Sequence, residues 1–131
     1  DNKTLVIEKS YIINETGINS LCFLPQKNAV LVGGKDAYFS IFSLDKKEIV
    51  FKVAAHNWAI YKILIANKHL YSCSRDKTIK EWDMHSLDPV KRYCYPDFKA
   101  HTHSVNNLVY IEKHAKIVSA GDDKAVCFWK L

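Results

Sequence analysis

Short stretches of alternating hydrophobic and polar residues follow one another along this chain, separated by turn residues. One unit begins at Asn14, His56 and His101, and its apolar residues fall at the same three places in each copy. These residues are Ile18, Leu21 and Phe23, then Ile60, Ile63 and Ile65, then Val105, Leu108 and Tyr110. A second apolar stretch follows a turn in each copy, over 30–33, 70–74 and 116–120. Short strands bounded by turns predict an all-β protein.

A second, independent column of the repeat is centred on an aspartate. The segment SCSRDKTIKEWD (72–83) recurs as SAGDDKAVCFWK (119–130) and more faintly as VGGKDAYFSIFS (32–43). The aligned residues Asp36, Asp76 and Asp123 are 40 and 47 residues apart, a spacing typical of a four-stranded blade. Aspartate suits such a turn because its carboxylate accepts hydrogen bonds from nearby backbone N–H groups. The third strand of each copy carries, in order, Phe42, Trp82 and Trp129.

The two columns divide a single domain over residues 1–131 into a lead strand and three units. The expected ranges are 1–13 for the lead strand, 14–53 for repeat one, 56–95 for repeat two and 101–131 for repeat three. Charge-rich outer strands are predicted over 48–53 and 90–95, whereas repeat three lacks its outer strand. The lead strand is therefore expected to belong to another blade or to complete one.

These residues resemble the WD-repeat β-propeller family, whose blades contain a strand reading roughly S-x-S-x-D-x-T-x-x-x-W-D. Repeat two fits that pattern at Ser72, Ser74, Asp76, Thr78, Trp82 and Asp83. The resemblance covers the chain from about Asn14 onward and implies a partial propeller of three four-stranded antiparallel blades. The segments NWAIYKI and SRDKTIKEWD are also similar to small bacterial members of the family.

The resemblance also implies a buried polar network in each blade, formed by its His, Ser or Thr, Asp and Trp columns. The members are His56, Ser72, Asp76 and Trp82 in repeat two, and His101, Ser119, Asp123 and Trp129 in repeat three. A closed network is needed because a buried imidazole or carboxylate without partners is costly. Repeat one has Asn14, Val32, Asp36 and Phe42 in these columns, so we expect it to rely on apolar packing and to be the least sharply specified blade.

Three blades cannot close into a ring, and two arrangements remain open. The chain is part of a longer propeller, or two copies form a six-bladed homodimer in which each lends its lead strand to the last blade of the other. An isolated arc of three blades would expose two apolar blade faces, so we expect it to associate.

A propeller fold implies where a partner would bind. The residue before each turn Asp and the residue five after each His-column position are expected at the rim of the central channel, with Trp58 in the adjoining loop. These rim residues are Lys35, Arg75, Asp122, Asn19, Tyr61 and Asn106. An exposed Trp and Tyr beside an Arg are typical of protein interfaces. The alternative is that Trp58 and Tyr61 only fill the gap between neighbouring blades.

The sequence lacks the signals of a metal site or of catalysis. His101, His103 and His114 have no Cys or acidic residue at the spacing of a zinc site, so we expect no metal. The chain has no GxGxxG, GxxxxGK[ST] or HExxH motif, so we expect neither a cofactor nor an enzyme.

Two other candidates for chemistry have plainer interpretations. Cys73 near His69 is interpreted as a core thiol, because nothing there would lower its pKa. The pair Asp122 and Asp123 leaves one solvated carboxylate, because Asp123 belongs to the turn.

Charge and cysteine content favour an interaction module of the cytoplasm. The net charge is +5, but only Arg75 and Arg92 are arginines and the lysines are spread along the chain, whereas nucleic-acid surfaces cluster basic groups and favour Arg. The cysteines, Cys22, Cys73, Cys94 and Cys127, show no CxxC pair or disulfide-rich spacing. No apolar stretch is long enough for a membrane span. We therefore expect a cytoplasmic protein that does not bind membranes.

The leading hypothesis is a non-catalytic scaffold that binds a protein or peptide partner. Two alternatives stay open: a Lys-rich propeller that binds nucleic acid through its phosphates, and the targeting module of a larger multidomain enzyme.

Overall fold

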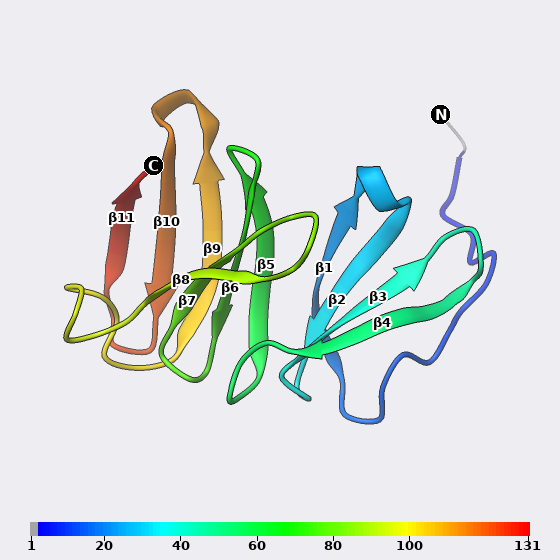
Figure 1. Cartoon of the computed structure of the whole chain (residues 1–131), viewed down its shortest axis with the longest axis horizontal. Coiled ribbons are helices and arrows are strands. Elements are labelled where there is room, and N and C mark those ends of the chain that lie inside the picture. The colour runs from blue at the N-terminus through cyan, green and yellow to red at the C-terminus, as the bar shows by residue number, and fades with distance from the viewer. Residues whose placement is uncertain (1–2) are drawn as a thin grey trace.

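The structure, a computed structural model, describes residues 3–131. Within that range the chain forms eleven β-strands in three antiparallel sheets, which stand side by side as an open arc (Figure 1). Short 3-10 turns, η1 (Pro25–Lys27) and η2 (Glu112–His114), connect the first two strands of the first and third sheets.

Each sheet is one blade, built from strands that are consecutive in the sequence. The first blade contains β1 (Ile18–Leu24), β2 (Ala29–Gly34), β3 (Tyr38–Ser43) and β4 (Glu48–Ala54). The second blade contains β5 (Ile60–Ala66), β6 (His69–Ser74), β7 (Ile79–Trp82) and β8 (Pro89–Tyr93). The third blade contains β9 (Val105–Ile111), β10 (Lys116–Gly121) and β11 (Val126–Lys130). The predicted all-β partial propeller is confirmed, with four, four and three strands rather than four in every blade.

The lead segment departs from the prediction of a strand over residues 1–13. Residues 1 and 2 lie outside the described residues, and residues 3–13 contain no strand. Tyr11 instead packs against Phe42 of β3, with ring centroids 4.9 Å apart. A strand needs an adjacent edge to satisfy its backbone groups, and the vacant outer-strand position lies beside β11, at the far end of the arc (Figure 1). Pairing of this segment with another blade therefore stays a prediction.

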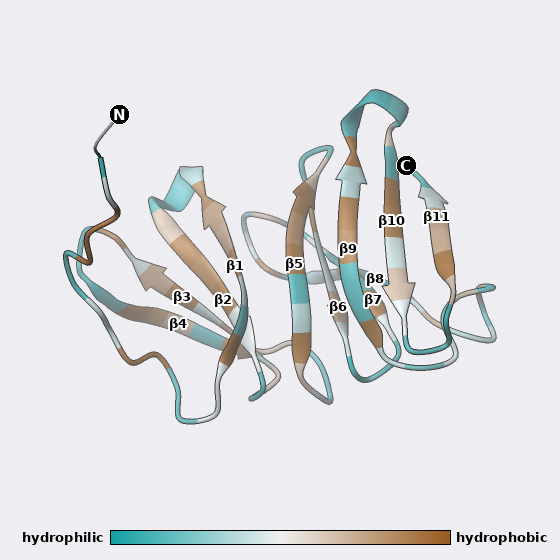
Figure 2. Ribbon diagram, turned by 180° about the vertical axis from the view of Figure 1, so that it is seen from behind, coloured by the Kyte–Doolittle hydropathy of each residue, from teal (hydrophilic) through white to brown (hydrophobic). Residues whose placement is uncertain are grey.

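The hydrophobic cores lie between neighbouring blades, because each inner strand presents side chains to both faces of its sheet. One core joins the first two blades and contains Leu31, Phe39, Ile63, Leu70 and Trp82, among others. A second core joins the second and third blades and contains Tyr71, Cys73, Ile79, Leu108 and Ile117, among others. Figure 2 shows hydrophobic residues concentrated on inner strands such as β2 and β10. The outer strands β4 and β8 are mostly exposed, as their charge-rich sequences predict.

The turns of the arc lie on two opposite faces. The three turns that hold the aspartate column, 34–37, 74–77 and 121–124, lie on the same side as the loops 55–59 and 94–104 (Figure 1). We call this side the Asp-turn face. The 3-10 turns, the β3–β4 turn (44–47) and the β7–β8 turn (83–88) lie at the other ends of the strands, on what we call the opposite face (Figure 1).

Candidate functional site

A buried polar chain crosses the second blade from the Asp-turn face to the middle of the sheet. His56 Nδ1 lies 2.8 Å from Asp76 Oδ2, and His56 Nε2 lies 2.7 Å from Ser72 Oγ. The indole N–H of Trp82 donates to the same Ser72 oxygen at 2.9 Å. The four residues come from the loop before β5, from β6, from the Asp turn and from β7, so the polar chain joins these four segments.

The protonation of this chain follows from its burial. Burial lowers the pKa of His56 below its ordinary value of 6.5, so the imidazole is neutral at neutral pH. Burial alone would raise the pKa of Asp76, but its hydrogen bonds to His56, Thr78 and the Asn57 N–H hold that pKa at about 2. Every group is satisfied when His56 Nδ1–H donates to Asp76 and the Ser72 hydroxyl donates to His56 Nε2.

The third blade contains the same kind of buried polar chain. His101 Nδ1 lies 2.9 Å from Asp123 Oδ1, and His101 Nε2 lies 2.8 Å from Ser119 Oγ. The Trp129 N–H donates to Ser119 Oγ at 2.8 Å. Asp123 also accepts the backbone N–H groups of Thr102 and Ala125. The structure thus brings together both quartets that the family resemblance implies.

The first blade has no such polar chain. Asn14 caps its own loop, accepting the Gly17 N–H at 2.8 Å, and Asp36 Oδ1 accepts the Tyr38 N–H at 3.1 Å. Asp36 Oδ2 is buried without a hydrogen-bond partner, 3.5 Å from the Lys52 amine. The first blade therefore has an incompletely satisfied carboxylate where the other blades have a closed network.

The order Ser72, His56, Asp76 repeats the hydrogen-bond sequence of a hydrolase triad, but its surroundings differ. The Ser72 side chain is fully buried, and its oxygen already accepts the Trp82 N–H. A nucleophilic serine must reach a substrate carbonyl. The arrangement at Ser72 joins β6 and β7 to the loop before β5 and leaves no room for attack.

Sequence reasoning matched Thr78 to the family motif but did not assign it to the network. Its hydroxyl donates to Asp76 Oδ1 at 2.6 Å and lies 3.1 Å from His56 Nδ1. The signal was present in the S-x-S-x-D-x-T pattern. Thr78 has no counterpart in the third blade, where Ala125 stands two residues after Asp123.

Trp58 and Arg75 form an exposed aromatic–cation pair on the Asp-turn face. Trp58 is 58% exposed, and the Arg75 guanidinium carbon lies 5.3 Å from the indole centroid. The backbone beneath them is held in two places, because Ser74 Oγ donates to the Trp58 carbonyl at 3.1 Å and the Arg75 N–H donates to the Ala59 carbonyl at 3.0 Å. The pair is therefore a cation–π contact on a fixed loop.

The other predicted rim residues separate into two groups. Asn106 donates to Asp122 at 2.6 Å, and both are exposed, as is Lys35. Asn19 donates to the Ile60 carbonyl at 2.9 Å, across the junction of the first two blades. Tyr61 packs against the core between the second and third blades. Asn19 and Tyr61 thus help join blades, whereas Trp58 and Arg75 form a pair on the surface.

The remaining candidates for chemistry are the cysteines and the possible metal ligands. All four cysteines are free, and burial raises the pKa of Cys73 to about 12. Residues 3–131 contain no group of three or more His, Cys, Asp or Glu side chains placed to hold a metal ion. The same range has no helix of the length and apolarity that crossing a bilayer requires.

Comparison with known proteins decides the family. The family model described as "WD domain, G-beta repeat" matches residues 47–83 and 92–130, which are more than half of the chain. The chain belongs to the WD-repeat family. WD repeats generally serve as protein-interaction scaffolds and are typically non-enzymatic. The matched segments contain both complete polar chains, and residues 1–46, with most of the network-free first sheet, lie outside them. The grouping with small bacterial members stays a prediction.

Solved structures show the same WD-repeat fold. The structure described as "Structure of U3-55K" superposes with a TM-score of 0.76 over 90% of this chain, at 19% sequence identity. This chain spans 37% of the length of that one. At such identity the likeness extends to the fold alone.

Proposed function

We propose that this chain is a non-catalytic scaffold that binds a protein or peptide partner through Trp58 and Arg75 on the Asp-turn face. The observation that carries the proposal is the exposed indole stacked with a guanidinium on a hydrogen-bonded loop. Trp and Arg are among the side chains most enriched at positions that dominate binding energy. A fixed loop also loses little conformational freedom when a partner binds.

The remaining exposed rim residues extend this surface on either side. Lys35 lies toward the first blade, and the hydrogen-bonded pair Asn106 and Asp122 lies toward the third. Their opposite charges and amide groups suit a polar rim around an aromatic centre. Asn19 and Tyr61 contribute through contacts that join neighbouring blades.

The experiment selects binding peptides from a displayed random library against the whole chain and then measures them with Trp58→Ala/Arg75→Glu. We expect the selected peptides to lose at least tenfold in affinity, with the melting temperature unchanged. The matched control is Tyr95→Ala/Arg92→Glu, which removes another exposed aromatic residue and arginine. Loss of folding in the first variant would show that Trp58 and Arg75 are structural.

Salt dependence separates this proposal from the nucleic-acid alternative. Peptide binding centred on an aromatic pair should change little between about 50 and 200 mM salt, whereas binding to phosphates falls by orders of magnitude over that range. A steep fall, together with competition by an oligonucleotide, would overturn the protein-partner proposal.

We also propose that further blades complete the disc, supplied by a longer polypeptide or by a second copy of this chain. The support is the exposed apolar side chains on the outward face of the third blade, Val126 and Phe128, and on that of the first, Leu21 and Phe23. Cytoplasmic location is part of the proposal and is supported by the four free cysteines.

A further inference from the structure

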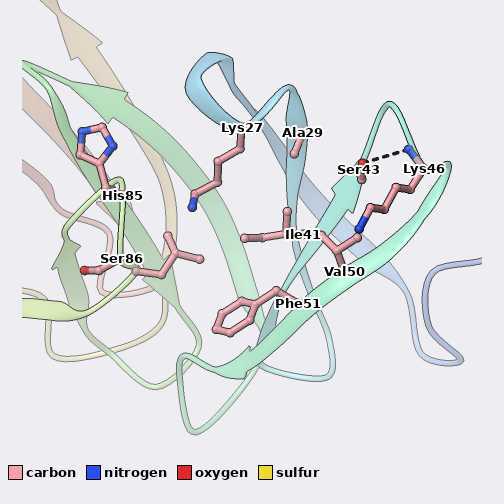
Figure 3. Close-up of a pocket in the computed structure, with 10 residues that line it drawn as sticks. Lys27, Ala29, Ile41, Ser43, Lys46, Val50, Phe51, His85 and Ser86 are labelled. Carbon is pink, nitrogen blue, oxygen red and sulfur yellow. Dashed lines mark hydrogen bonds between the residues drawn. The ribbon is translucent and has the colours of Figure 1, made fainter.

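An open pocket lies on the opposite face, at the junction of the first two blades (Figure 3). Its volume is about 460 Å³, within the range of small-ligand and peptide-side-chain pockets. Three separate segments meet there: the η1 turn with the start of β2, the end of β3 with β4 and the turn between them, and the β7–β8 turn. It lies at the other ends of the strands from Trp58 and Arg75, so a ligand there would not cover the proposed site.

The base and one wall of the pocket are apolar. Ala29, Ile41 and Leu87 are buried in the core between the blades and form the base. Val50 and Phe51 of β4 form a wall and remain 46% and 45% exposed. An apolar side chain inserted here would remove both from water, which is favourable in proportion to the area covered.

Every titratable side chain that lines the pocket is basic. These side chains are Lys27, Lys46 and His85. Figure 3 shows the amino groups of Lys27 and Lys46 directed from opposite sides toward the apolar residues. Within residues 3–131 neither amine takes part in an ion pair. Their charges are therefore available to an incoming anionic group.

Two carboxylates close in sequence to the lining residues accept hydrogen bonds within turns. Asp45 accepts the side-chain amide of Asn28 at 3.0 Å. Asp83 accepts the backbone N–H groups of His85 and Ser86, both at 2.8 Å, and these hydrogen bonds lower the pKa of Asp83. Asp45 and Asp83 thus hold turns in place, and the residues that line the pocket include two lysines and no carboxylate.

The equivalent junction between the second and third blades has its own acid. Glu81 occupies in the second blade the position that Ile41 occupies in the first, and it is also buried. Its two oxygens lie 2.6 Å from His69 Nδ1 and 2.7 Å from the Tyr93 hydroxyl. One junction therefore has a carboxylate with internal partners, whereas the other has free amines and no carboxylate among its lining residues.

We propose that the pocket between the first two blades binds an acidic peptide, which inserts one apolar side chain against Phe51 and Leu87 and places carboxylates beside Lys27 and Lys46. An apolar base between two amines fits an apolar residue flanked by Asp or Glu. A bare phosphate backbone would use the amines and leave the apolar base exposed. This second site gives the scaffold a binding face on each side of the disc.

The test uses a peptide labelled at its N-terminus, fluorescein-Glu-Asp-Leu-Asp-Leu-Glu-Asp-amide, and fluorescence polarisation with the whole chain. One control peptide has Gln and Asn in place of Glu and Asp, and another has Ser in place of both Leu. We expect saturable binding of the acidic apolar peptide and at least tenfold weaker binding of each control. Equal binding of either control would overturn the proposal, because it requires both the charge and the apolar side chain.

Variants of the chain place the binding site. Lys27→Glu/Lys46→Glu should weaken binding of the peptide about tenfold or more, because it replaces attraction by repulsion. Phe51→Ser tests the wall independently of charge and should weaken binding severalfold. The matched control is Lys113→Glu, in the equivalent 3-10 turn of the third blade, which should change little. Unchanged affinity in both the double-lysine variant and Phe51→Ser would overturn the proposal.

Two further measurements separate this site from its alternatives. Trp58→Ala/Arg75→Glu should leave the affinity for the acidic peptide unchanged, so the two faces can fail independently. An oligothymidylate of fifteen nucleotides should bind weakly and without dependence on Phe51. Tight, Lys27-dependent and Lys46-dependent binding of the oligonucleotide in place of the peptide would instead make the pocket a nucleic-acid site.

Discussion

Phe39 and Val126 occupy the same position in the first and third blades, three residues after the turn aspartate, yet Phe39 is fully buried and Val126 is 59% exposed. Phe39 is covered by the second blade, where its ring lies 4.9 Å from that of Trp82. Ile41 and Phe128 repeat the contrast, with exposed fractions of 5% and 67%. The side of the third blade that carries Val126 and Phe128 is therefore an uncovered blade face.

Covering this face should drive association of the isolated chain. We expect sedimentation velocity to show concentration-dependent association, and Phe128→Lys to shift it to at least tenfold higher protein concentration, because a charge on the face opposes burial. The control Val90→Lys changes an exposed apolar residue on the outer strand β8 and should associate as the unmodified chain does. A chain that stays monomeric at all concentrations would contradict this.

Removing the shared oxygen of the second-blade network should destabilise the fold. Ser72→Ala leaves the Trp82 N–H and His56 Nε2 without their buried partner, at a cost of about 1 to 3 kcal/mol in the free energy of unfolding. Denaturant titration measures this value, and Ser86→Ala, at an exposed serine, is the control. A loss below about 0.5 kcal/mol in Ser72→Ala would mean that the network adds nothing beyond ordinary surface effects.

The same network should make stability fall in acid. The folded pKa of His56 lies below 6.5, so the unfolded chain binds a proton first, and stability decreases as pH falls from about 6.5 toward the folded pKa. The folded pKa of Asp76 is about 2 against 3.8, so a second decrease begins near pH 4 and continues toward pH 2.

Unfolding free energies at pH values of about 8, 6, 5 and 4 measure the first of these decreases. His56→Gln should be less stable throughout and should flatten the change between about pH 7 and 5. The matched control is His85→Gln, which replaces an exposed histidine outside the polar chain. Stability that rises as the solution is acidified through this window would contradict a lowered pKa for His56.

The first blade should open more readily than the second. It lacks the polar chain, it contains a carboxylate oxygen without a hydrogen-bond partner, and only one of its faces is covered by another blade. Hydrogen exchange followed by mass spectrometry should find the amides of β2 and β3 exchanging faster than those of β6 and β7. If the amides of β2 and β3 exchanged most slowly, apolar packing alone would stabilise the first blade at least as well as the polar chain stabilises the second.

Much of this architecture follows from local sequence, because turn chemistry and side-chain alternation act over a few residues and recur in each repeat. The Asp columns and apolar triplets predicted the inner strands of all three blades to within a few residues. The resemblance to the WD-repeat family named the His, Ser, Asp and Trp residues that form hydrogen-bonded chains in the second and third blades. Repetition strengthened a pattern that one copy alone would have shown only weakly.

The tertiary structure decided what each strand face meets. The local sequence does not predict that Val126 is exposed whereas Phe39 is buried, because the exposure of this position depends on whether another blade lies beside it. The lead segment has an apolar sequence, but strand formation requires a partner edge that the described chain does not place beside it. Lys27, Lys46 and His85 lie in three separate turns, and only the packing of two blades brings them to one pocket. Sequence determined the blade as a local unit, whereas contacts between blades, which join distant segments, determined the surfaces available for binding.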